Sequence, residues 1–140
     1  MSKSKDNVIY PEDLASKGYK GDQIRFFLID RHYRKRLNFS YEKLDAASRR
    51  LDAFKSMVQD LRNAESSSSS EKAKKLVCAI VPSFEYAMNN DLNVQGAFDC
   101  LFDIVSKLDS LNETGRLSAQ DAKSALEALE RVDHIFRIVF

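Results

Sequence analysis

A run of basic and aromatic residues near the beginning of the chain carries its most suggestive chemistry. Six consecutive residues make up this run: Arg31, His32, Tyr33, Arg34, Lys35 and Arg36. Arginine forks suit phosphate oxygens, and exposed aromatic rings can stack on unpaired bases. The run therefore predicts a surface that contacts RNA. The alternative is an ordinary solvated basic connector with Tyr33 buried in the protein core.

The cysteines and histidines do not have the spacing of a metal site. Cys78 and Cys100 lie far apart in the sequence, without a CxxC pattern or a nearby histidine ligand. We therefore predict neither a zinc site nor a disulfide framework, and we expect both thiols to be free and buried. His134 is expected at the rim of the last helix, and His32 is expected to pack or to face RNA.

The size and charge of the chain limit the classes of protein that it can represent. Its 140 residues suit one compact domain, with or without a tail. The 22 Lys and Arg residues nearly balance 21 Asp and Glu residues, so attraction for a polyanion has to come from local clusters. No apolar run reaches the length of a signal peptide core or a membrane span. These features predict a soluble, cytoplasmic protein with no membrane partner.

The first 40 residues are predicted to hold short helical elements joined by loops. Pro11 suits the first turn of a helix and Gly18 its end, so they frame a short helix with the sequence PEDLASK. Asp22 is expected to cap a second helix, QIRFFLIDR, with Ile24, Phe27 and Leu28 on its apolar side. The sequence HYRKRLNF then favours an extended connector. We treat residues 1–40 as a connective unit.

Residues 41–140 have the pattern of long amphipathic helices. Apolar residues recur at steps of three or four from Tyr41 to Leu61, and the serine run at 65–70 interrupts the pattern. Pro82 predicts a kink near Ile80, or two short helices, within 71–89. Further helices are expected after the capping residues, which are Ser40, Asn93 and Ser118 with Asp121. We predict an all-α antiparallel helical bundle, with the pairs Phe26/Phe27 and Phe98/Phe102 in its core.

Three motifs together resemble one family of enzymes. The opening MSKS matches the last four residues of the KMSKS signature of class I aminoacyl-tRNA synthetases. The stretch GDQIRFFLIDRHYRKRLNFS at 21–40 resembles the cysteinyl-tRNA synthetase pattern of an Arg-aromatic-Phe-Leu helix followed by His-Tyr-Arg and Leu-Asn-Phe/Tyr-Ser. The stretch FEYAMNNDLNVQGAFDCLFDIVSKL at 84–108 is similar to the segment of that family that precedes a Leu-Phe-Asp helix. The resemblance covers nearly the whole chain and ends near RVDHIFRIVF.

This resemblance implies a role for each part of the chain. Residues 1–40 would carry the remnant of the signature loop and the connective segment, and residues 41–140 the stem-contacting helical bundle. By position, Lys3 would be the catalytic lysine beside the ATP phosphates, and Ser2 and Ser4 would shape its loop. The parent family uses ATP and magnesium to attach cysteine to its tRNA.

Other features of the family are not found in this sequence. The His-Ile-Gly-His type signature for ATP and the Cys, His and Glu ligands of the family's zinc are not recognisable. Asp6 replaces the usual glycine after the signature loop, Asn90 an acid and Val94 a threonine. The C-terminal portion that recognises the anticodon in the family is also missing. The chain is therefore expected to be inactive alone, with neither ATP nor zinc bound.

Several interpretations stay open from the sequence. The first is a fragment of a cysteinyl-tRNA synthetase, and it leaves undecided whether Met1 is a natural start. The second is a stand-alone module that binds tRNA or another RNA, but not DNA, or that docks on a separate catalytic domain. The third is a structural bundle without a ligand. A cysteine ligase that acts on a sugar amine is a lesser alternative of the same fold.

Overall fold

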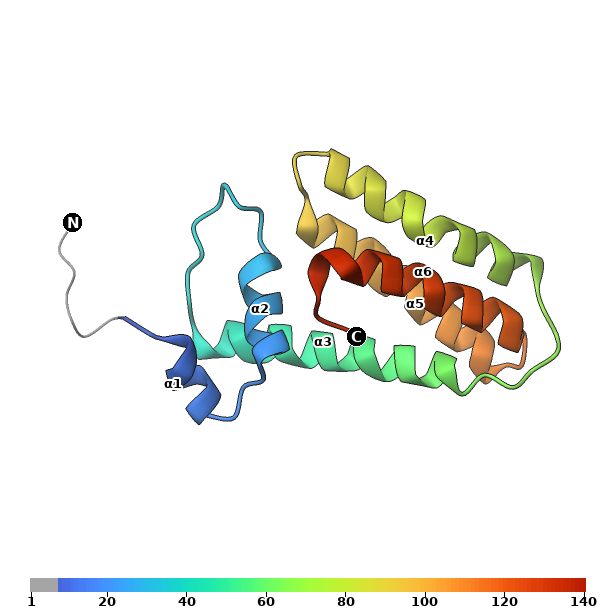
Figure 1. The fold of residues 1–140 in the computed structure, drawn as a ribbon, viewed down its shortest axis with the longest axis horizontal. Helices are drawn as coiled ribbons and strands as arrows, with labels where there is room; N and C mark the ends of the chain where they lie inside the picture. The colour runs from blue at the N-terminus through green and yellow to red at the C-terminus, as the bar shows by residue number, and fades with distance from the viewer. Residues whose placement is uncertain (1–7) are drawn as a thin grey trace.

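The computed structural model describes residues 8–140, and every regular element in that range is a helix (Figure 1). In chain order these are α1 (Pro11–Ser16), α2 (Gly21–Ile29), α3 (Tyr41–Arg62), α4 (Glu71–Asn89), α5 (Val94–Glu113) and α6 (Ala119–Phe136). The predicted all-α class is confirmed.

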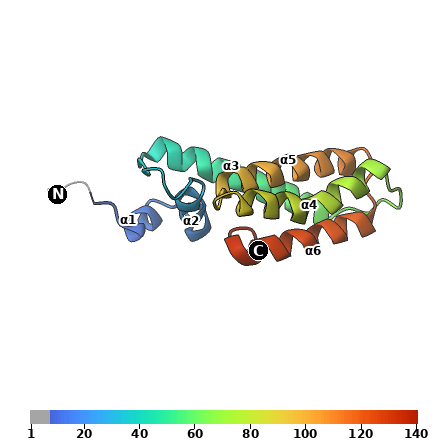
Figure 2. The same ribbon diagram turned by 90° about the horizontal axis from the view of Figure 1, so that it is seen from above.

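The four long helices α3 to α6 form a bundle in which consecutive helices run in opposite directions (Figures 1 and 2). Both α3 and α4 pack against α5 and α6, so α3 and α4 lie at opposite corners of the bundle. Half of the neighbouring pairs, α3 with α5 and α4 with α6, therefore run parallel. The loops of 63–70 and 114–118 make this order possible because each connects helices on a diagonal of the bundle.

Aromatic rings fill the end of the bundle that faces α2. Phe54 and Phe98 are almost completely buried, with ring centroids 5.0 Å apart. Phe26 of α2 inserts beside them, 4.4 Å from Phe98. Phe102 is only partly buried and packs against the outside of this group. The predicted core positions of Phe26 and Phe98 are thus confirmed, and Phe102 lies at the core boundary.

A smaller apolar cluster joins the N-terminal elements to the beginning of α3. Its buried members are Leu14, Ile24, Phe27 and Leu44. Because α2 packs against both this cluster and the bundle core, its buried face includes Phe26 as well as Ile24 and Phe27. Leu28 points away from both clusters and is 53% exposed, so its predicted place on the buried face is wrong.

The helix starts follow the predicted capping residues with one exception. The side chains of Ser40, Asn93 and Ser118 each accept a hydrogen bond from a backbone N–H in the first turn of their helices. The predicted cap at Asp22 is wrong because α2 begins at Gly21, two residues before the predicted start at Gln23, with Lys20 at the cap position. Asp22 instead forms an ion pair with Lys55 of α3, which ties α2 to the bundle.

Pro82 lies inside α4, which runs unbroken from Glu71 to Asn89, so the predicted alternative of two short helices is wrong. Proline removes one backbone hydrogen bond from such a helix. Ile80 and Phe84, on either side of Pro82, are both buried in the bundle core. Their packing holds the two halves of α4 in one helix despite the missing bond.

Both cysteines are free and exposed, so the prediction that they are buried is wrong. The buried face of α4 is set by Ala73, Ile80, Phe84 and Ala87, and Cys78 lies off this stripe. Cys100 likewise lies off the stripe of α5. The general tendency of free cysteine to be buried is therefore overridden by the position of each residue around its helix.

Candidate nucleic-acid interface

The basic run occupies the loop between α2 and α3, and Asp91 in the turn between α4 and α5 fastens this loop to the bundle. The Tyr33 hydroxyl donates a hydrogen bond of 2.7 Å to Asp91 Oδ1. His32 Nε2 lies 3.3 Å from Asp91 Oδ2, and Arg34 Nη2 lies 3.3 Å from Asp91 Oδ1. One carboxylate thus gathers three consecutive side chains of the loop.

The backbone of the α4–α5 turn presents this carboxylate. Asp91 and Leu92 both have a positive φ, 55° and 52° respectively. Aspartate tolerates this left-handed conformation better than most residues. The sequence reasoning did not identify Asp91, although an acid in an Asn-rich turn directly before a capped helix was available as a signal.

The hydrogen bond between Tyr33 and Asp91 shifts the pKa values of both groups. Donation from the Tyr33 hydroxyl lowers the pKa of Asp91, and Arg34 and His32 lower it further. The same bond raises the pKa of Tyr33 above its ordinary value of 10.0. At neutral pH the pair is therefore a carboxylate that accepts a hydrogen bond from a neutral phenol.

The ring of Tyr33 is partly covered by neighbouring side chains but remains accessible to solvent. The side chain is 60% exposed, so the alternative in which Tyr33 is buried in the core is wrong. His32 stacks on the ring, with centroids 4.9 Å apart and an interplanar angle of 20°. The guanidinium carbon of Arg34 lies 5.4 Å from the ring centroid. The three side chains form one stacked group on the surface of the loop.

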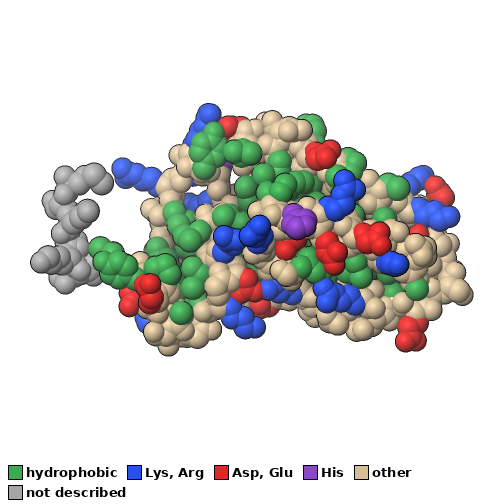
Figure 3. Space-filling model, viewed as in Figure 1, with side chains coloured by type: hydrophobic (Ala, Val, Ile, Leu, Met, Phe, Trp, Pro, Cys, Tyr) green, Lys and Arg blue, Asp and Glu red, His purple; other side chains and the backbone are tan. Residues whose placement is uncertain are grey.

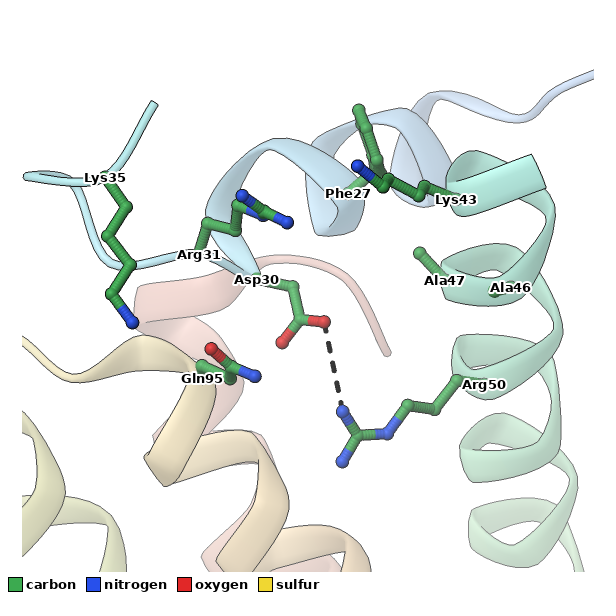
Figure 4. Close-up of a pocket in the computed structure, with 9 residues that line it drawn as sticks. All are labelled: Phe27, Asp30, Arg31, Lys35, Lys43, Ala46, Ala47, Arg50 and Gln95. Carbon is green, nitrogen blue, oxygen red and sulfur yellow. Dashed lines mark ion pairs between the residues drawn. The ribbon is translucent and has the colours of Figure 1, made fainter. Parts of the chain in front are cut away.

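Two other members of the basic run face a different feature, a pocket of about 410 Å³ (Figure 4). Arg31 and Lys35 both line it from the loop that follows α2. Its walls and floor are completed by Phe27, Asp30, Lys43, Ala46, Ala47, Arg50 and Gln95. Arg36 is exposed, and its carbonyl accepts a 3.1 Å hydrogen bond from Arg31. The structure therefore divides the predicted run into a group on Asp91, a group on the pocket, and the exposed Arg36.

Asp30 is the carboxylate of this pocket. Its Oδ1 atom is buried and has no hydrogen-bond partner within residues 8–140. Its Oδ2 atom lies 3.9 Å from Arg50 Nη1 of α3, and Figure 4 shows the two side chains pointing toward each other. Burial raises the pKa of Asp30 to about 6, with Arg50 opposing the shift and Asp99 adding to it.

This raised pKa predicts that Asp30 opposes folding at neutral pH. The folded protein binds the proton of Asp30 more tightly than the unfolded chain does, since the folded pKa of about 6 exceeds the ordinary value of 3.8. Stability from this group is thus present at low pH and lost as pH rises through 6. Asp30→Asn is expected to raise the free energy of unfolding by about 1–2 kcal/mol at pH 7.5, allowing for residual solvent exposure.

Urea unfolding of both proteins at pH 7.5 and pH 4 measures this effect. The difference should disappear near pH 4, where Asp30 is protonated in the folded wild-type protein. Glu85→Gln removes an exposed acid on α4 and serves as the control, with little change at either pH. A gain that is equal at both pH values would show that desolvation of the charge is not the cause.

The remaining sequence predictions concern the signature-loop residues, metal binding and membrane-spanning helices. Ser2, Lys3 and Ser4 lie outside the described residues, and their role stays a prediction. Within residues 8–140 there is no group of three or more His, Cys, Asp or Glu side chains that could hold a metal ion. None of the helices described combines the length and the apolar character that crossing a membrane requires.

Comparisons with known proteins agree with the motifs. Residues 83–139, which span the end of α4 and all of α5 and α6, match the model of the DALR domain. The cysteine--tRNA ligase of Chlamydia pneumoniae is 32% identical over 141 residues, covering 99% of this chain and 30% of that protein. Those of Koribacter versatilis and Protochlamydia amoebophila are 34% and 27% identical, over 99% of this chain and 28% and 29% of their own lengths.

The fold is a helical bundle, and its residues 83–139 are similar to the DALR domain. The resemblance to cysteinyl-tRNA synthetases is confirmed, because the match extends along 99% of the chain. The chain spans about 30% of the length of the cysteine--tRNA ligases it matches.

Proposed function

We propose that this chain is the helical, tRNA-contacting part of a cysteine--tRNA ligase. The observation that carries the proposal is the basic loop: Arg34, Lys35 and Arg36 are exposed, and the loop is fastened to the DALR-matching region through Asp91. A loop held in this way can present its cations to a rigid RNA stem with little ordering cost.

The proposed reaction of the whole ligase is the ATP-dependent attachment of cysteine to its tRNA. In this proposal Lys3, with Ser2 and Ser4, belongs to the loop that contacts the ATP phosphates, where magnesium would also bind. A lysine ammonium at that position stabilises the negative charge that develops as pyrophosphate leaves. The described bundle would position the tRNA rather than take part in bond making.

The charge distribution supports binding through a local cluster. The net charge is only +1, and basic and acidic side chains are interspersed across the face of the bundle shown in Figure 3. A phosphate-binding surface on such a protein depends on a small number of contacts. Its affinity for RNA should therefore fall with salt according to the number of phosphates neutralised.

The test is binding of a fluorescent tRNA with a cysteine anticodon, followed by anisotropy over a series of salt concentrations. The double variant Arg34→Gln/Arg36→Gln should weaken binding and reduce the slope of log K against log salt by about 2. Lys72→Gln removes one exposed cation from the start of α4, beside the serine loop, and should leave the slope unchanged.

Two results would contradict the proposal. The first is wild-type binding no tighter to tRNA than to duplex DNA of equal charge, which would indicate unspecific attraction. The second is an equal loss of affinity in the double variant and in Lys72→Gln, which would show that the loop is not the contact surface. Circular dichroism of each variant checks that the helices are intact.

A further inference from the structure

The pocket beside the basic loop brings together side chains from separate parts of the chain. Asp30 and Arg31 directly follow α2, Lys35 lies further along the loop, and Lys43 and Arg50 come from α3. Gln95 joins them from the first turn of α5 (Figure 4). Four cations therefore face one carboxylate, and the pocket has an excess of positive charge.

Three of these cations have no carboxylate within ion-pair distance in residues 8–140, although the charge of Arg31 acts on Asp30 and lowers its pKa. Arg31, Lys35 and Lys43 form no ion pair with any carboxylate of residues 8–140. Lys43 Nζ has only a long contact of 3.5 Å with the Asn38 carbonyl. Their charges are therefore available to a ligand.

Arg50 differs from these three cations because its charge is paired with a carboxylate. It forms an ion pair with Asp99, and its guanidinium lies 5.1 Å and 5.4 Å from the ring centroids of Phe98 and Phe102. These contacts hold Arg50 as a fixed wall of the pocket. The movable cations are Lys35 and Lys43, on long side chains at the pocket rim.

The volume of the pocket and its place at the N-terminal end of α5 also suit an anionic ligand. A volume of about 410 Å³ is within the usual range for small-ligand sites, roughly 300–1,000 Å³, and exceeds what a bare phosphate needs. Gln95 lies at the N-terminal end of α5, a helix of 20 residues, where the helix dipole places partial positive charge.

We propose that this pocket binds one backbone phosphate of RNA together with part of its nucleotide, held by Arg31, Lys35 and Lys43. The inference rests on the proposed function, and it adds Lys43 of α3 to the contact surface. Asp30 acts against the ligand in this site, because its carboxylate repels the phosphate. Free phosphate offers the same oxyanion, and the experiment separates the two sources.

The first measurement is tRNA binding by two variants with opposite expected effects. Lys43→Gln should weaken binding by roughly three- to tenfold and lower the salt slope by about 1. Asp30→Asn should tighten binding, because it removes the opposing charge while keeping a similar shape. The control is Lys123→Gln, an exposed lysine on α6, which should bind as wild type does.

The second measurement is a titration with inorganic phosphate and with adenosine 5′-monophosphate, followed by amide NMR. The nucleotide should shift the signals of Ala46, Ala47 and Gln95 more than phosphate does at equal concentration. These shifts should be lost in Lys43→Gln, whose unfolding midpoint is checked in parallel.

The outcomes distinguish this inference from the proposed function. Salt-dependent tRNA binding that is unaffected by Lys43→Gln and Asp30→Asn, with no pocket shifts, overturns the inference and leaves the proposed function standing. If both phosphate and adenosine 5′-monophosphate shift the pocket signals but the protein does not bind tRNA, the ligand of the pocket is not RNA. That result overturns the inference and the proposed function together. Weakening by Lys43→Gln together with tightening by Asp30→Asn supports the inference.

Discussion

Phe54→Ala is expected to lower the free energy of unfolding by about 3–5 kcal/mol. Phe54 of α3 is 1% exposed, and its ring lies 5.0 Å from Phe98 and 6.1 Å from Phe102. Removing the ring leaves a cavity where α2, α3 and α5 meet. Neighbouring aromatic rings cannot close this cavity without leaving their own contacts, so most of the lost packing should appear in the measured stability.

Urea unfolding followed by circular dichroism measures this loss. The matched control is Arg49→Ala on an exposed face of the same helix, which should change stability by less than about 0.5 kcal/mol. An unchanged midpoint for Phe54→Ala would mean that the apolar stripe of α3 does not form the core of the folded protein in solution.

Asp133→Ala is expected to cost about 2–4 kcal/mol by releasing the C-terminal residues. Asp133 is buried, and its carboxylate accepts hydrogen bonds from the backbone N–H groups of Ile138 at 3.0 Å, Val139 at 3.1 Å and Phe140 at 3.1 Å. Arg137, in the left-handed conformation with φ 52°, turns the chain back toward this carboxylate. The turn places Ile138 in the core at 2% exposure.

Unfolding experiments and amide hydrogen exchange together test this role. In Asp133→Ala the amides of Ile138 and Val139 should exchange much faster than in wild type, because their acceptor is gone. Asp133→Asn keeps one oxygen acceptor and should show a smaller loss. Glu130→Ala, an exposed acid one turn earlier in α6, is the control. Unchanged exchange at Ile138 in Asp133→Ala would show that core packing alone holds the segment.

Parts of the fold that depend on neighbouring residues could be predicted from the sequence. The repeat of apolar residues between Tyr41 and Leu61 predicted α3, and the structure places that helix at Tyr41–Arg62. Ser40, Asn93 and Ser118 were correctly predicted as caps because each acts on an amide three residues away. The family resemblance likewise came from short motifs.

The anchoring of the basic loop and the pocket were decided by tertiary structure. Tyr33 and Asp91 are 58 residues apart, and Arg50 and Asp99 are 49 apart, so no local pattern pairs them. The exposure of the cysteines and the continuity of α4 through Pro82 also depended on which helix face met the bundle.

The sequence by itself determined the positions of the long helices, most helix starts and the resemblance to one family, because periodicity and capping act within one or two helical turns and the motifs are short. Only the tertiary structure decided which cations are held by Asp91 and which line a pocket with Asp30. The physical reason is that burial and ion pairing depend on elements brought together by packing. Distances along the chain carry no record of that arrangement.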